Sequence, residues 1–212
     1  MTEPEWLFFD MGGTLIDETA AWDDRISRTC ERHGISQADF RAAMAEAASN
    51  NQMEYFSALE RFGVAQREKW NSAPEVPYPE AKAVLEALKD RGYRLGIIAN
   101  QALNARDRLK KFGLYELFEV IVISQEQGVS KPQHAIFLDA LYKAGVTADS
   151  CAMIGDKLTN DILPAKQLGF KTVWIRQEWG GMQNITCDEM RPDYIINDLM
   201  ELLRLFSQEV QR

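Results

Sequence analysis

Short apolar runs alternate with amphipathic helical segments along most of this 212-residue chain. The runs that we predict to be strands are residues 5–9, 93–99, 118–123, 151–154, 171–175 and 194–196. The segments with apolar residues at helical spacing are residues 81–88, 106–112, 135–142, 161–168 and 199–208. Apolar strands that alternate with helices are typical of a parallel sheet that is covered on both faces. The pattern therefore predicts an α/β fold with a doubly wound parallel sheet.

Residues 18–72 show helical periodicity and no predicted strand. Gly34 and Gly63 are placed to end the first and third of three predicted helices, and Ser36 to cap the second. The residues expected on the apolar faces are Trp22, Ile26 and Cys30, then Phe40, Met44 and Ala47, then Met53, Phe56, Leu59 and Phe62. The proline-rich segment 72–79 predicts a stiff return to the core. We therefore expect a small helical cap at residues 18–72, inserted after the first strand of a core formed by residues 1–17 and 73–212.

Composition and charge narrow the classes of function. A hydrophobic content of 46% in 212 residues suits one α/β core with a modest insertion. The net charge of −8, without a cluster of Lys and Arg, disfavours a nucleic-acid or anionic membrane surface. Three widely spaced cysteines argue against a disulfide framework and fit the reducing cytoplasm. The acidic segment 1–5 does not resemble a signal peptide, and no apolar run approaches membrane-spanning length.

Four residues that carry chemistry lie just after a predicted strand or at the start of a helix: Asp10, Lys131, Asp156 and Asp161. In a doubly wound sheet such points converge at the carboxyl ends of the strands. Carboxylates that meet there repel one another unless a cation neutralises them, and oxygen ligands are those that Mg²⁺ prefers. A lysine in the same cluster neutralises negative charge on a nucleophile or a phosphate. The sequence therefore predicts a Mg²⁺ site that also contains a lysine.

Three segments resemble, in order, motifs of the haloacid dehalogenase-like (HAD) superfamily. Residues 10–14, Asp-Met-Gly-Gly-Thr, resemble motif I, which is usually Asp-x-Asp-Gly-Thr. The Lys131-Pro132 segment resembles motif III, and residues 155–161, from Gly-Asp to Asn-Asp, resemble motif IV. The helical insertion is similar to the C1-type cap of the family. Three motifs in order are specific, whereas any one alone is weak.

The resemblance implies a role for each matching residue. Asp10 would be the nucleophile, and Lys131 would neutralise the charge of Asp10 and the phosphate. The implied Mg²⁺ ligands are Asp10, Asp156 and the backbone carbonyl of Gly12, with Asp161 as a supporting charge. The remaining positions implied to bind substrate are Gly13, Thr14 and Asn100. The implied function is a Mg²⁺-dependent phosphatase that acts on a small phosphorylated metabolite through an aspartyl-phosphate on Asp10.

Two positions depart from the family pattern. Gly12 stands where the second Asp of motif I acts as general acid/base, and Ala99 stands where motif II has a Ser or Thr. A missing general acid removes about 10²–10⁴ in rate, so we expect activated phosphates to be favoured. Another acid at the cap hinge is a candidate replacement; these acids are Asp17, Glu18, Asp23 and Asp24. The simpler interpretation of each is a solvated helix start, where carboxylates interact favourably with the helix dipole.

Two other functions remain open. In a 2-haloacid dehalogenase the departing halide needs no proton. The metal-type motif IV argues against this function, and so does the lack of an arginine clearly placed in the cap to hold the substrate carboxylate, for which Arg25 and Arg28 are the candidates. The second is a catalytically degenerate protein that binds a phosphorylated ligand or a partner. If Gly12 is simply a lost acid, Gly12→Asp should raise phosphatase activity.

Two surface features are candidates to enclose a substrate. Trp22, Tyr55 and Phe56 of the cap are candidates to line its pocket, although Phe56 belongs more simply to the core of the cap. The segment Trp179-Gly180-Gly181 is either a loop over the crevice or a plain surface turn.

Overall fold

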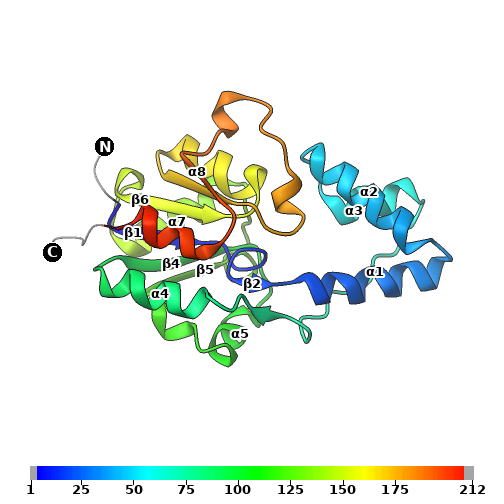
Figure 1. Ribbon diagram of the computed structural model, residues 1–212, viewed down its shortest axis with the longest axis horizontal. Helices are drawn as coiled ribbons and strands as arrows, with labels where there is room; N and C mark the ends of the chain where they lie inside the picture. The colour runs from blue at the N-terminus through cyan, green and yellow to red at the C-terminus, as the bar shows by residue number, and fades with distance from the viewer. Residues whose placement is uncertain (1–3, 208–212) are drawn as a thin grey trace.

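The computed structural model describes residues 4–207 and shows a six-stranded sheet with helices on both sides (Figure 1). The strands are β1 Trp6–Phe9, β4 Arg94–Ala99, β5 Val120–Ile123, β6 Cys151–Gly155, β7 Lys171–Ile175 and β8 Tyr194–Ile196. Their order across the sheet is β5-β4-β1-β6-β7-β8, and each neighbouring pair is parallel. The predicted α/β fold with a doubly wound parallel sheet is confirmed.

Two predictions fall on ends of the chain outside the described residues. Residues 1–3 belong to the acidic N-terminal segment, and residues 208–212 include the predicted end of the last helix at residue 208. Within residues 4–207, none of the helices combines the length and the apolar character that a membrane crossing requires. Cys30, Cys151 and Cys187 are all free thiols.

Helices bury both faces of the sheet. Those of the core are α4 Ala81–Asp90, α5 Ala105–Lys111, α6 Ser124–Gln127, α7 His134–Ala144, α8 Leu163–Leu168 and α9 Leu202–Leu205. Short 3₁₀ turns are η1 Tyr115–Leu117, η2 Ala148–Ser150, η4 Gly180–Met182, η5 Asp188–Met190 and η6 Leu199–Glu201. Successive side chains of a strand point to opposite faces. Accordingly, Leu7 and Phe9 pack in one buried cluster with α4, α5 and α9, and Trp6 and Phe8 pack in the other with α7 and α8.

The position of β1 in the sheet determines where the site forms. β1 lies between β4 and β6, so the chain adds strands first on one side of β1 and then on the other. In register, Phe9 pairs with Ile97 of β4 and with Ile154 of β6. The backbone N–H of Asp10 donates to the carbonyl of Ile154 at 2.9 Å. The residues that follow these three strands therefore meet at one edge, the switch point at which α/β sheets bind ligands.

The helical insertion extends from this edge to one side of the sheet (Figure 1). It contains α1 Thr19–His33, α2 Gln37–Ser49 and α3 Glu54–Arg61, which share a buried cluster of their own. Gly34 ends α1 in the left-handed conformation at φ 65°, and the Ser36 hydroxyl accepts from the Asp39 N–H at 3.4 Å, as predicted. The two connections to the core pair as short antiparallel strands, β2 Ile16–Asp17 and β3 Val76–Pro77, which the sequence pattern did not predict.

The predicted apolar face of the third helix is partly wrong. Met53 is 65% exposed and Phe56 is 40% exposed, whereas Tyr55, Ala58 and Leu59 are buried. Met53 lies outside the helix as the N-cap of α3. Within the helix, Tyr55, Ala58 and Leu59 pack against α1 and α2, and Phe56 lies about 100° around the axis from Tyr55. Tyr55 therefore belongs to the core of the insertion and does not line a pocket.

A glycine in β4 gives the first prediction. Gly96 pairs with Phe8 across the sheet, and a Cβ at position 96 would lie 2.5 Å from Phe8 Cδ1. Phe8 has no freedom to move away, because it is fully buried and stacked on Trp6 at 5.4 Å. We expect Gly96→Ala to lower the free energy of unfolding by about 1–3 kcal/mol, measured by urea denaturation. In a Phe8→Leu background the cost of Gly96→Ala should be smaller; equal costs in both backgrounds would contradict this account.

Candidate active site

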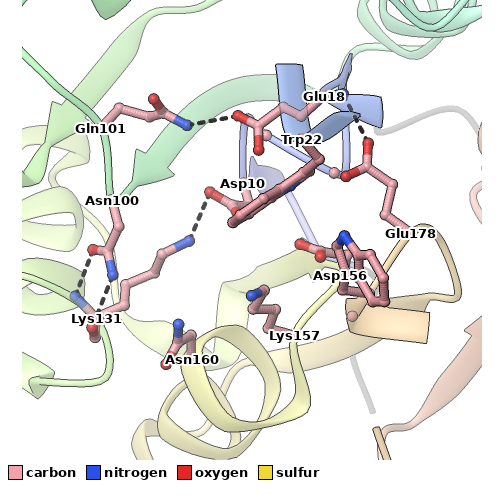
Figure 2. Close-up of a pocket in the computed structure, with 14 residues that line it drawn as sticks. Asp10, Glu18, Trp22, Asn100, Gln101, Lys131, Asp156, Lys157, Asn160 and Glu178 are labelled. Atoms are coloured by element: carbon pink, nitrogen blue, oxygen red, sulfur yellow. Dashed lines mark hydrogen bonds and ion pairs between the residues drawn. The ribbon is translucent and has the colours of Figure 1, made fainter. Parts of the chain in front are cut away.

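A pocket at the carboxyl edge of the sheet contains most of the predicted site residues (Figure 2). Those that line it are Asp10, Gly12, Gly13, Asn100, Lys131 and Asp156. Asp161 and Thr14 do not line the pocket and are both fully buried. The topology therefore brings together residues that are up to 151 positions apart in sequence, from Asp10 to Asp161.

Lys131 joins two of the acids. Its Nζ lies 2.8 Å from Asp10 Oδ1 and 2.6 Å from Asp161 Oδ1, in a position only 3% exposed. Burial alone would lower the pKa of the Lys131 ammonium, but the two carboxylates outweigh it and the pKa is raised. The side chain of Asn100 holds the backbone of Lys131: Asn100 Nδ2 donates to the Lys131 carbonyl at 2.9 Å, and the Lys131 N–H donates to Asn100 Oδ1 at 2.8 Å. Lys131 is thus a fixed positive charge against Asp10.

Asp156 is the acid that Lys131 does not neutralise. It is 2% exposed, and among residues 4–207 its carboxylate has a hydroxyl contact, from Thr14 Oγ1 at 3.5 Å, but no ion pair. Burial raises the pKa of Asp156 well above its ordinary value, and Asp161 and Asp10 raise it further. Carboxylate oxygens of Asp10, Asp156 and Asp161 all lie within 4.8 Å of one another.

These contacts fit a divalent cation between Asp10 and Asp156. Both oxygens of Asp161 already have partners, because Oδ1 contacts Lys131 and Oδ2 accepts from the Lys157 N–H at 2.9 Å. The hard oxygens that remain are those of Asp10 and Asp156, with the Gly12 backbone beside them in the pocket. The acidic cluster therefore suits Mg²⁺, and the oxygens of Asp10 and Asp156 are those that could hold it.

Three glycines allow the chain to pack directly against the acids. A Cβ at Gly13, whose φ is +69°, would lie 2.8 Å from Asp156 Oδ2, and a Cβ at Gly180 would lie 2.5 Å from the Asp156 carbonyl. A Cβ at Gly155 would lie 2.5 Å from Cγ of Asp161. Trp179 and Gly180 also line the pocket, so the segment Trp179-Gly180-Gly181 forms the loop over the crevice.

Gly13 and Thr14 lie in a turn that is already hydrogen-bonded. The Gly13 N–H donates to the Ile16 carbonyl at 2.9 Å, and the Thr14 hydroxyl faces Asp156. The turn thus positions Asp156 and leaves the Gly13 surface open to the pocket. Ala99, at the motif II position, is fully buried in a core cluster and contributes no polar group to the site.

Four further pocket residues were not among the predicted site residues: Gln101, Lys157, Asn160 and Glu178. Lys157 Nζ lies 2.6 Å from Glu54 Oε1 and so connects the pocket to α3 of the insertion. Glu178 accepts from the Glu18 N–H at 2.8 Å and from the Tyr78 hydroxyl at 3.1 Å. Their sequence signal is weak, because each depends on how loops far apart in the chain approach one another.

For Glu18, the interpretation as a solvated helix start is wrong. Its carboxyl accepts from Gln101 Nε2 at 3.3 Å and faces the pocket beside Trp22 (Figure 2). Burial raises the pKa of Glu18 to about 8, the carboxylates of Glu178, Glu75 and Asp10 raise it as well, and the Gln101 hydrogen bond opposes them.

The other acids of the cap hinge have local roles. Asp17 accepts from the Thr19 N–H at 2.9 Å, Asp23 pairs with Arg41 at 2.8 Å, and Asp24 pairs with Arg28 at 2.9 Å. Arg25 stacks on the Tyr55 ring at 3.8 Å.

The fold and the site together define a hydrolase with an α/β core, a strand-end acid and a helical insertion beside it. The model of the family described as "haloacid dehalogenase-like hydrolase" matches residues 5–169, and the chain belongs to this family. A glyceraldehyde 3-phosphate phosphatase from Pyrococcus abyssi is 33% identical over 80% of this chain and 80% of its own. A phosphoglycolate phosphatase from Nitrosococcus oceani is 24% identical over 98% of this chain and 99% of its own.

Solved structures share the architecture. A HAD phosphatase from Thermococcus onnurineus aligns with a TM-score of 0.66 and 26% identity, covering 97% of this chain and 100% of that chain. A dehalogenase aligns over 100% of both chains with a TM-score of 0.71 and 22% identity, which demonstrates a common fold.

The raised pKa of Glu18 predicts a pH-dependent stability. The folded protein keeps a proton on Glu18 up to a pKa of about 8, whereas the unfolded chain loses it near the ordinary value of 4.5. The contribution of Glu18 is therefore full below pH 4.5 and is lost as the pH rises toward 8. Between these values we expect the unfolding free energy of the wild type to fall relative to that of Glu18→Gln by at most about 1.4 kcal/mol per pH unit.

The measurement is urea denaturation from pH 5 to 8 with a chelator present. Asp24→Asn is the matched control, because its pKa is lowered from 3.8 and its titration lies below this window. If the curves of wild type and Glu18→Gln run parallel, Glu18 is not held in its protonated form.

Proposed function

We propose that this chain is a Mg²⁺-dependent phosphatase that acts on a small phosphorylated metabolite through an aspartyl-phosphate on Asp10. The observation that carries the proposal is the unequal pairing of the three acids: Lys131 pairs with Asp10 and Asp161, while Asp156 faces the pocket and forms no ion pair among the described residues. Hydrolase relatives named as phosphatases of small metabolites support the same class of substrate.

Asp10 is positioned to attack phosphorus. It follows the central strand β1, its backbone is fixed by the hydrogen bond to Ile154, and its carboxylate opens to the pocket. Lys131 offsets the repulsion between this carboxylate and an approaching phosphate, since a preorganised cation acts most strongly in a buried site. Asn100 holds the Lys131 backbone in place at the phosphate side of the pocket.

The proposed metal ligands are the carboxylates of Asp10 and Asp156 and the backbone carbonyl of Gly12. When bound there, Mg²⁺ supplies positive charge to phosphate oxygens. Asp161 orients Lys131, and Thr14 orients Asp156. Gly13 leaves room for the phosphate at the floor of the pocket.

Residues 18–72 are the proposed cap, and residues 1–17 and 73–212 the proposed core. Contacts across the two are specific: Lys157 pairs with Glu54, and Asn51 and Asn184 exchange hydrogen bonds of 2.8 and 2.9 Å. With Trp22 from α1 and Trp179 from the loop beside the pocket, the enclosed space suits a small substrate. The three free thiols support a cytoplasmic location.

The 2-haloacid dehalogenase function is less well supported. A haloacid carries its own carboxylate, and the pocket presents Glu18, Asp156 and Glu178 beside Asp10. Arg28 is engaged by Asp24 and Glu68, and the guanidinium of Arg25 by the Tyr55 ring and the Glu68 carbonyl. Neither arginine lines the pocket around Asp10, although Arg25 lines an adjoining cavity that shares Glu18, Trp22, Asn100 and Gln101 with it.

The test is phosphate release from glyceraldehyde 3-phosphate, 2-phosphoglycolate and acetyl phosphate, with Mg²⁺ and with a chelator. We expect release to require Mg²⁺ and to fall by about 10³-fold or more in Asp10→Asn, because the nucleophile is lost while the carboxamide preserves the shape of the site. Asp24→Asn, whose side chain pairs with Arg28 away from the pocket, is the matched control.

Equal release by wild type and Asp10→Asn would exclude the aspartyl-phosphate route. A wild type that binds Mg²⁺ but hydrolyses none of these three phosphates would favour the binding-protein alternative.

A further inference from the structure

We propose that Glu18 is the general acid/base of this enzyme, and that it reaches the site from the start of the cap in place of a side chain at position 12. The inference rests on the proposed phosphatase function. It identifies the group that donates a proton to the leaving oxygen and accepts one from the attacking water.

The first observation is that Glu18 fills the space beside Gly12. A Cβ added at Gly12 would lie 2.5 Å from the Glu18 carboxyl carbon Cδ and 2.8 Å from Oε2, with Oε1 closer still. In an aspartate the carboxyl carbon is one bond beyond Cβ. The Glu18 carboxyl therefore occupies the region into which an acidic side chain at position 12 would project, and the two cannot coexist without a rearrangement.

The second observation is that the position of Glu18 is fixed from two sides. Its N–H donates to Glu178 Oε1 at 2.8 Å, and its carboxyl accepts from Gln101 Nε2 at 3.3 Å. The carbonyl oxygen of the Gln101 side chain accepts from Arg108, which also pairs with the buried Glu75. The chain of contacts leads from a buried ion pair to the Glu18 carboxyl, so its place in the pocket does not depend on a flexible surface side chain.

The third observation is that no cationic side chain of the described residues holds the Glu18 carboxyl in an ion pair. Among residues 4–207 no lysine or arginine forms an ion pair with it, whereas Asp24 in α1, the helix that Glu18 precedes, pairs with Arg28 at 2.9 Å. Figure 2 shows the Glu18 carboxyl directed into the pocket, with the Asp10 carboxylate between it and the Lys131 ammonium in this view. A carboxyl that forms no ion pair among the described residues thus lines the same pocket as the nucleophile.

The two half-reactions balance with these two acids. In the first, an Asp10 oxygen bonds to phosphorus, the bond from phosphorus to the leaving oxygen breaks, and the proton of Glu18 passes to that oxygen. In the second, the Glu18 carboxylate takes a proton from water, the water oxygen bonds to phosphorus, and the bond from phosphorus to Asp10 breaks. Inorganic phosphate leaves, and Glu18 is protonated again.

If Glu18 is the general acid/base, two expectations that followed from the missing acid at position 12 change. Phosphates with poor leaving groups become substrates, because a proton donor is present. Gly12→Asp alone should lower activity rather than raise it, because the new side chain collides with the Glu18 carboxyl.

The test compares wild type and Glu18→Gln, with Mg²⁺, on 2-phosphoglycolate as an alkyl phosphate and on acetyl phosphate as an acyl phosphate. We expect kcat/KM for the alkyl phosphate to fall by about 10²–10⁴-fold, and that for the acyl phosphate by about tenfold at most, since its leaving group needs little protonation. Phospho-enzyme should accumulate in Glu18→Gln with acetyl phosphate, because water activation is also lost. Asp24→Asn should change neither ratio.

A second pair of variants tests the role of Glu18 without a glutamine at position 18. A structural effect of that glutamine therefore cannot decide the result. Gly12→Asp/Glu18→Ala should hydrolyse the alkyl phosphate at least tenfold faster than Glu18→Ala, because removal of the Glu18 carboxyl makes room for an acid at position 12. Equal losses on both substrates in Glu18→Gln, or no rescue in the double variant, would overturn the role of Glu18 and leave the phosphatase function intact. A wild type without Asp10-dependent turnover would overturn both.

Discussion

The repulsion between buried carboxylates is the constraint on which the rest of the site depends. The strand order places Asp10 and Asp156 at adjacent strand ends, and the π-helical segment Leu158–Ile162 after β6 adds Asp161. One lysine between two of the three acids reduces the repulsion, because its single positive charge pairs with both carboxylates and leaves the third acid free for a metal. The glycines that pack on Asp156 and Asp161 follow from the same constraint, since acids held this close to the backbone leave no space for a side chain.

Much of this arrangement could be predicted from sequence because it depends on local signals. Strand-end acids in a parallel α/β pattern converge whatever the details of the loops, which is why Asp10, Lys131 and Asp156 come together as expected. The ends of two helices could be predicted for the same reason: Gly34 ends α1 and Ser36 caps α2 through contacts within one helical turn. Where a residue's role is determined by its neighbours in sequence, the pattern suffices.

The features that could not be predicted depend on long-range approach. Strands of two residues, such as β2 and β3, are too short for any alternation, and they form because the two ends of the insertion lie side by side. The inward face of α3 is determined by its packing against α1 and α2, so Phe56, about 100° around the helix from Tyr55, is exposed although its spacing from Leu59 fits an apolar stripe. Gln101 and Glu178 acquire their importance only through Glu18, which lies 83 and 160 positions away in sequence.

Gly12 shows why a motif position is best judged together with the space around it. Taken alone, a glycine in place of an acid indicates a lost function; in the folded protein the same glycine is required, because the Glu18 carboxyl occupies the space of its missing side chain. The proposed transfer of the acid from position 12 to position 18 has a mechanical consequence. Position 12 belongs to the turn after β1, whereas Glu18 immediately precedes α1. The place of the proton-transferring group therefore depends on the position of α1 relative to the core. The contacts of Glu178 and Gln101 with Glu18 then couple the position of α1 to the chemistry at Asp10.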